Sequence, residues 1–189
     1  MNDERKNAEK RLWQSIARVA QDSGKEAGWE YLGYACSQKK IHDLVLKFHQ
    51  DPRHPGFYGL RIPIGEVGGM KVSMILENQK ELVIGIQMED PEDNTVESGA
   101  FDLYRDFCNR LSESGRDWQL DSPGWLAWKT PEVRLNFRAV NNRAFQDIIQ
   151  GRDNSEALYL ITEEVTDLVE EVSELIVNQK VVEYGAVTN

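Results

Sequence analysis

The chain has few residues of the kinds that crosslink small proteins or bind metals. It holds 2 cysteines and 3 histidines among 189 residues. Cys36 and Cys108 are too few for a disulfide framework and lack the Cys-x-x-Cys spacing of a zinc site. The sequence therefore excludes a disulfide-stabilised fold, and we expect two reduced, structural thiols.

Long apolar runs are also missing. No segment approaches the roughly 18 to 20 apolar residues that cross a bilayer. The first ten residues are charged and contain no apolar stretch of signal-peptide length. We therefore expect a cytoplasmic protein without a membrane span.

Basic charge is scarce, with 22 Lys and Arg against 32 Asp and Glu and a formal net charge of −10. Contacts to phosphate need clustered basic side chains, so this balance argues against a general nucleic-acid binder. The charge is uneven: residues 1–50 hold nine bases and seven acids, whereas residues 153–176 hold eight acids and no base. No glycine-rich nucleotide loop, nucleophile elbow or Cys-His pair is present, and no cofactor is predicted.

What remains is an ordinary globular composition, 40% hydrophobic and 29% charged, at a length that suits one domain over residues 1–189. Residues 71–88 alternate apolar and polar side chains around a turn at residues 78–80, which predicts a central β-hairpin. Further strands are predicted at residues 57–64, 124–129 and 132–139, with a turn at Pro131 joining the last two. Residues 27–35 are aromatic without a clear period; strand and helix both fit, and we favour a short strand or turn.

Helices are predicted where apolar residues recur every three or four positions, at residues 3–22, 38–50, 99–114, 141–150 and 155–178. In the first, the apolar stripe is Ala8, Leu12, Ile16, Val19 and Ala20, and the remaining faces carry Arg5, Lys6, Glu9, Lys10 and Arg18. The predicted fold class is α+β, an antiparallel sheet of about five strands with amphipathic helices covering mainly one face.

The last predicted helix carries a heptad-like seam, formed by Leu158, Ile161, Val165, Leu168, Val172 and Leu175. About three heptads are marginal for an independent coiled coil, so we expect the seam to pack on the sheet. A homodimer or the capture of a partner through this helix is the alternative.

Two groups of side chains could bind a metal ion. His42, His49 and His54 fall within thirteen residues, but their spacing completes no familiar site. The loop with Glu89, Asp90, Glu92 and Asp93 lacks the regular spacing and glycine of a calcium loop, so a solvated turn is favoured over a cation site. We predict no metal.

Three tryptophans, Trp118, Trp125 and Trp128, lie near Lys129, Arg134 and Arg138. Large aromatic side chains are usually core, and we expect this of Trp128 and one neighbour. A protein-binding hot spot and a stacking platform for single-stranded nucleic acid are the alternatives.

Four stretches, residues 72–88, 125–129, 135–138 and 161–176, resemble the C-terminal, non-catalytic part of large prokaryotic proteins of the PD-(D/E)xK nuclease superfamily. The resemblance covers residues 57–178. The catalytic Asp…(Asp/Glu)-x-Lys core of that superfamily has no counterpart here. The resemblance therefore implies an accessory or binding domain from a bacterium or phage, and no cleavage.

The sequence predicts a non-enzymatic protein-binding or regulatory domain, such as an inhibitor, whose acidic last helix and Trp-rich hairpin contact a basic surface of another protein. The predicted binding residues are Trp125, Trp128, Arg134, Arg138, Glu163, Glu164, Asp167 and Glu170. One alternative is a divergent metal-dependent nuclease using Asp90 and Glu132, although Arg134 stands where such a site needs lysine. The other is an anionic decoy of a nucleic-acid-binding protein.

Overall fold

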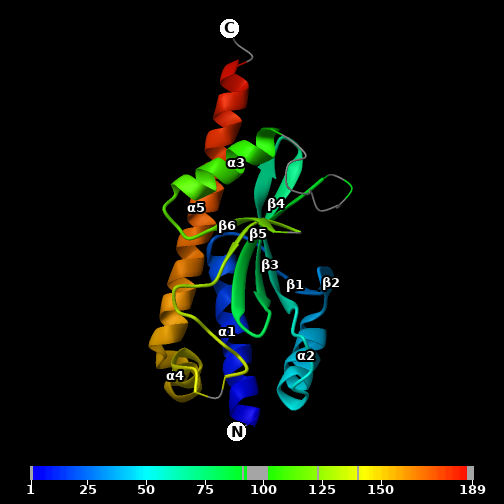
Figure 1. The fold of residues 1–189 in the computed structure, drawn as a ribbon, viewed down its shortest axis with the longest axis vertical. Helices are drawn as coiled ribbons and strands as arrows, with labels where there is room; N and C mark the ends of the chain where they lie inside the picture. Colours follow the sequence, from blue (N-terminus) through cyan, green and yellow to red (C-terminus); the bar gives the residue numbers. More distant parts are fainter. Residues whose placement is uncertain (1, 91, 93–101, 123, 140, 187–189) are drawn as a thin grey trace. The chain divides into compact units, whose positions relative to one another are not determined.

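The computed structural model of the chain describes residues 2–90, 92, 102–122, 124–139 and 141–186. Its elements, drawn in Figure 1, are α1 (Asn2–Asp22), β1 (Gly28–Tyr31), β2 (Tyr34–Cys36), α2 (Gln38–Gln50), β3 (Tyr58–Val67), β4 (Met70–Asn78), β5 (Leu82–Glu89), α3 (Asp102–Glu113), β6 (Gln119–Ser122), β7 (Trp125–Lys129), α4 (Arg143–Gly151), the 3-10 helix η1 (Arg152–Asn154) and α5 (Glu156–Ala186). The α+β class is confirmed. Within the described residues, however, the antiparallel sheet has seven strands rather than about five, in the order β2-β1-β3-β4-β5-β7-β6.

The chain divides into two compact units, each assembled from three separate segments. The first unit comprises Met1–Ile62, Ile75–Ile84 and Thr130–Thr166, and the second comprises Pro63–Met74, Gly85–Lys129 and Asp167–Asn189. The single domain over residues 1–189 stays a prediction, with these two units as its parts. No helix in the described ranges has the length and apolarity of a membrane span.

In the first unit, α1 packs against α2 and α4. Tyr58 of β3 lies between two helices: its ring contacts Trp13 of α1 at 6.4 Å and Phe48 of α2 at 6.0 Å between centroids. Both helices therefore cover the same face of β3. Ser37 caps α2 as its position suggests, because its Oγ accepts a hydrogen bond from the Lys40 amide at 3.2 Å.

The aromatic stretch after α1 forms the antiparallel hairpin β1–β2, which agrees with the favoured strand or turn. Tyr31 pairs with Tyr34, and β1 pairs on its other side with β3. The two residues of the turn, Leu32 and Gly33, both have positive φ, +53° and +77°. Such turns match the twist of a hairpin but favour asparagine or glycine, so Leu32 holds a conformation that a leucine rarely adopts.

The predicted strand at residues 132–139 is wrong. Only an isolated bridge between Glu81 and Asn136 forms there. The Oδ1 atom of Asn136 accepts the amides of Arg138 at 2.9 Å and Ala139 at 2.8 Å. This local turn occupies the N–H groups that a longer ladder would need.

The Trp-rich hairpin also has a different partner from the one predicted. Strand β7 pairs with β6, which the sequence reading missed, with Gln119 opposite Trp128 and Leu120 opposite Ala127. The central hairpin is confirmed, although its turn follows Asn78 and lies at residues 79–81. The predicted start of α3, residues 99–101, lies outside the described residues.

Helix α5 is longer than predicted and continues to Ala186. Its seam is turned inward: Ile161, Val165, Leu168 and Val172 have no exposed surface. The side chains of the seam are thus already buried within the chain. A dimer through these side chains would first require the seam to open.

Trp125 constrains β5 through Gly85, in the second unit. A Cβ atom added at Gly85 would lie 1.8 Å from the Cε3 and Cζ3 atoms of Trp125. We expect Gly85→Ala to lower the free energy of unfolding by about 1 to 3 kcal/mol because the ring must move. Urea unfolding of the single variant, and of the double variant with Trp125→Leu, measures this cost and its relief.

The matched control is Gly28→Ala on β1, where the nearest atom to the added Cβ, the Arg61 carbonyl oxygen, is 4.0 Å away. Equal losses in the two alanine variants would contradict the steric argument.

Candidate functional site

Helix α5 carries the acidic side chains that the sequence singled out, and they lie in different environments. Asp167, Glu170 and Glu174 are exposed and belong to the second unit. Their spacing of three and four residues places them on one face of the helix. We call these three residues the acidic face of α5.

One basic side chain borders the acidic face. Arg116 pairs with Glu171 at 2.8 Å, and its Nη2 lies 3.9 Å from the carboxylate of Asp167. No ion pair of Glu170 or Glu174 is found among the described residues. These two charges are therefore presented to solvent.

Two of the predicted binding residues, Glu163 and Glu164, lie in the part of α5 that belongs to the first unit, and they differ in exposure. Glu163 is exposed and accepts a hydrogen bond from the Tyr159 hydroxyl at 2.8 Å. Glu164 is 7% exposed, and its Oε2 accepts the Glu132 amide at 2.9 Å. Glu164 thus positions the chain after β7 and is not available to a partner.

The three tryptophans of the second unit differ in burial. Trp118 is buried, with the Nζ atom of Lys129 5.9 Å from its ring centroid. Trp125 packs against Gly85, and Trp125 and Trp128 are both half-buried. No tryptophan of β7 is fully exposed, but the expectation of a core position for Trp128 is not met: Trp128 is half-buried, and Trp118 is the buried one of the three.

The two arginines predicted to bind a partner, Arg134 and Arg138, have different surroundings. The guanidinium of Arg138 stacks 3.6 Å above the ring of Phe48. It donates to the carbonyl oxygens of Phe48, Asp51 at 3.0 Å and His54 at 2.6 Å. Arg138 therefore holds the end of α2 and the following loop. Burial lowers the pKa of the Arg138 guanidinium.

Arg134 is exposed and lies at an open groove of about 470 Å³, together with Arg143, Asp147 and Leu160. The Asp147 carboxylate accepts the Ser155 hydroxyl at 2.6 Å and the Ala157 amide at 2.9 Å. These bonds lower the pKa of Asp147 and cap the start of α5. The groove thus carries both basic and acidic side chains, and its charge does not favour a ligand of either sign.

The nuclease alternative gains no assembled site. Asp90 belongs to the second unit and Glu132 to the first. Within the acidic loop, Glu92 donates its amide to Asp90 at 2.9 Å, a local turn, and Asp93 lies outside the described residues. Among the residues that the structure describes, no three His, Cys, Asp or Glu side chains could hold a metal ion.

The three histidines do not meet. Burial lowers the pKa of His42 and His54, and Lys10 and Arg138 respectively add to the effect. His49 is almost fully buried, with its Nε2 atom 2.7 Å from the Oε2 atom of Glu9.

A buried polar cluster around Glu9 was missed by the sequence reading, which placed this residue on a polar face of α1. Its carboxylate has no exposed surface. Its Oε1 atom accepts the Trp13 indole at 3.2 Å, the Tyr58 hydroxyl at 2.7 Å and the Asn78 amide at 3.0 Å. Burial and the charge of Glu9 raise the pKa of Tyr58 well above its ordinary value, so the phenol acts as a donor. The sequence does contain a signal for this burial. Glu9 lies three, four and seven residues before Leu12, Trp13 and Ile16, a spacing that places it on the same helix face as these apolar residues.

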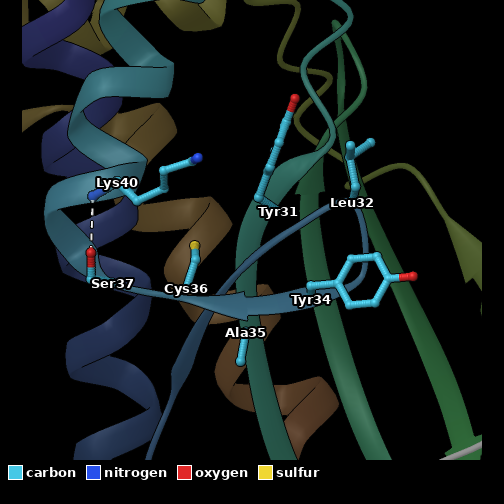
Figure 2. Close-up of a pocket in the computed structure, with 7 residues that line it drawn as sticks. All are labelled: Tyr31, Leu32, Tyr34, Ala35, Cys36, Ser37 and Lys40. Carbon is cyan, nitrogen blue, oxygen red and sulfur yellow. Dashed lines mark hydrogen bonds between the residues drawn. The ribbon is translucent and has the colours of Figure 1, made fainter.

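The first unit also has an exposed apolar surface, shown in Figure 2. An open groove of about 490 Å³ lies against the β1–β2 hairpin and the start of α2. We call it the hairpin groove; its lining includes Tyr31, Leu32, Tyr34, Cys36, Ser37 and Lys40. Leu32 is 51% and Tyr34 78% exposed. The Lys40 Nζ lies 5.7 Å from the Tyr31 ring centroid.

The chain matches no protein-family model, no curated protein and no solved structure. The resemblance to the PD-(D/E)xK superfamily therefore stays a prediction. Function has to be argued from the surfaces of the chain itself.

We expect Glu9→Gln to lower the free energy of unfolding by about 2 to 4 kcal/mol, because one carboxylate oxygen becomes a donor among buried donors. Urea unfolding at pH 7 measures the loss. The matched control is Glu4→Gln, an exposed position on the same helix, for which we expect a change under about 0.5 kcal/mol. A loss no larger at Glu9 than at Glu4 would show that the cluster adds nothing to stability.

Glu77 gives the unfolding free energy a specific pH dependence. Burial raises the pKa of its carboxyl to about 7 from 4.5; a hydrogen bond from Gln79 opposes the rise and the charge of Glu30 adds to it. Between these values the folded chain retains a proton that the unfolded chain has lost, so stability falls as pH rises through this window. The contribution is fully present below about pH 4.5 and lost above about pH 7.

We therefore expect Glu77→Gln to raise the free energy of unfolding by about 1 to 3 kcal/mol relative to the wild type at pH 8. At pH 4 we expect no such increase. Chemical denaturation across this range gives the comparison, with the exposed Glu66→Gln as control. A pH-independent difference between the variant and the wild type would refute a neutral Glu77 in the folded chain.

Proposed function

We propose that the chain is a non-enzymatic protein-binding domain whose acidic face of α5 contacts a basic surface of another protein. The observation that carries this proposal is the division of α5 into a buried seam and an exposed acidic face. Val172 has no exposed surface, while Asp167, Glu170 and Glu174 face solvent. The helix is thus anchored by its apolar side chains, and Glu170 and Glu174, which form no ion pair among the described residues, can make contacts outside the chain.

Charge composition supports the same proposal. A net charge of −10, with no base in residues 153–176, favours encounter with a basic partner by long-range attraction. Exposed charges act through solvent, so such binding weakens as salt rises. The partially paired Asp167 contributes less than Glu170 and Glu174, because Arg116 lies beside it.

Neither alternative has an observation of its own. A decoy of a nucleic-acid-binding protein would use the same acidic face, and the partner would then be displaced by DNA. A nuclease would use Asp90 and Glu132, which belong to different units.

The test is the capture of a stoichiometric protein from nuclease-treated cell lysate by the tagged full-length chain, with the triple variant Asp167→Lys, Glu170→Lys and Glu174→Lys as comparison. We expect the variant to lose at least about 90% of the captured protein, since three attractive contacts become repulsive. Glu163→Lys alone tests the first-unit part of α5. Glu164 is left unchanged because it is buried.

The control variant carries Asp22→Lys, Glu26→Lys and Glu66→Lys, three exposed acids outside α5. Each exchange adds two charges, so both triple variants go from −10 to −4. If both triple variants lost the captured protein equally, net charge alone would explain the binding and the acidic face of α5 would have no specific role. Capture unchanged in the α5 variant, or recovery of nucleic acid alone from untreated lysate, would reject the proposal.

A further inference from the structure

The hairpin groove is a second candidate surface, on the first unit, and it differs in charge from the acidic face of α5. Residues 1–50 carry nine bases and seven acids in a chain of net charge −10. Lys39 and Lys40 are both exposed in the first turn of α2, which contains no acidic residue. The positive end of the helix dipole adds to this charge.

The apolar side of the groove comes from one face of the hairpin. The pairing of Tyr31 with Tyr34 and of Trp29 with Cys36 places these four side chains on the same face. The acidic residue of β1, Glu30, belongs to the opposite face, where it is 3% exposed and bound to Arg61 at 3.0 Å. The aromatic face thus meets Lys40, and the acidic residue of β1 is turned to the other side of the hairpin.

Leu32 and Tyr34 are exposed in a way that folding does not explain. They are two of the five large exposed hydrophobic residues found in the described part of the chain. Leu32 also adopts the left-handed φ of +53°, where asparagine or glycine is the usual residue. The backbone of this strained leucine is held by its amide bond to Phe57, but half of the residue's surface is in water, which points to contact with another molecule.

The edge of the sheet supplies the remaining element. In the described sheet β2 is the first strand, and β1 is its one neighbour. Its outward backbone groups can pair with an added strand. Figure 2 shows Tyr34 at the end of this strand next to the turn, and Cys36 nearer to Lys40.

We propose that the hairpin groove binds an extended segment of a partner protein that carries acidic side chains among apolar ones. The segment adds to the edge of β2, its apolar side chains contact Leu32 and Tyr34, and a carboxylate pairs with Lys40. Charge complementarity decides in favour of an acidic segment. This surface is built from other residues than the acidic face of α5, so the proposal goes beyond the function argued above.

The test begins with a displayed library of random twelve-residue peptides, selected on the immobilised full-length chain. We expect the enriched peptides to combine Asp or Glu with alternating apolar residues. One enriched peptide is then synthesised, and its Kd is measured by fluorescence anisotropy for the wild type and each variant. A lack of enrichment over a chain-free surface, or enrichment of basic peptides, would overturn the proposal.

The variants are chosen to retain the fold. Leu32→Asn removes the apolar side chain and suits the left-handed backbone, and Tyr34→Thr keeps a residue that favours strands. We expect the double variant to weaken peptide binding by at least about tenfold. Lys40→Glu should weaken it by about tenfold as well, whereas Lys47→Glu, exposed in the last turn of the same helix, should leave it unchanged.

Circular dichroism and thermal melting establish that each variant is folded. An equal Kd for the wild type and the double variant would refute the site. The triple α5 variant should bind the peptide as the wild type does, which separates a failure here from a failure of the proposed function.

Cys36 offers a readout located in the groove. It is partly exposed, whereas Cys108 is buried and provides an internal reference. Bound peptide should slow the alkylation of Cys36 by iodoacetamide at least about fivefold, measured by mass spectrometry, because the segment covers the thiol. Unchanged alkylation at saturating peptide would place the binding elsewhere. Concentration-dependent dimerisation that Tyr34→Thr abolishes would instead identify a second copy of the chain as the occupant.

Discussion

The buried carboxylate of Glu9 is the constraint on which the first unit depends. It joins four elements, because its hydrogen-bond partners come from α1, α2, β3 and β4. A charge without solvent contact is tolerated only where hydrogen bonds replace water, and here every contact is to a side chain fixed by its own packing. The cluster thereby links α2 to β3, which also pack through the rings of Phe48 and Tyr58. Arg138 reinforces it by stacking on Phe48 and holding the carbonyl groups at the end of the helix.

This arrangement is what places the hairpin groove. Figure 1 shows the β1–β2 hairpin beside α2, and β1 also pairs with β3. Because α2 and β3 are both held by the Glu9 cluster, Lys40 at the start of α2 has a defined place next to the aromatic face of the hairpin. The turn residue Leu32 is held as well, since its amide donates to the Phe57 carbonyl at 2.8 Å. A rigid support of this kind reduces the entropy that a binding surface loses on association.

The sequence reading succeeded where a pattern is local and failed where a distant partner intervenes. The alternation in residues 71–88 predicted the central hairpin, because a half-buried strand repeats every two residues. The strand at residues 132–139 alternates equally well, but the side chain of Asn136 takes the next two amides and ends the pairing after one bridge. Strand β6 was missed because residues 119–122 contain too few apolar side chains to show a period.

The candidate sites follow the same division. By itself, the sequence determined the α+β class, the helix seam of α5 and the concentration of acid in residues 153–176, since periodicity and composition require no knowledge of neighbours. Only the tertiary structure decided which acids are buried. Glu9 meets a histidine 40 residues away and an asparagine 69 residues away, and Glu164 meets an amide 32 residues away. Burial depends on which segments come together in space, and the polarity of a residue cannot report contacts that its own neighbours in the chain do not make.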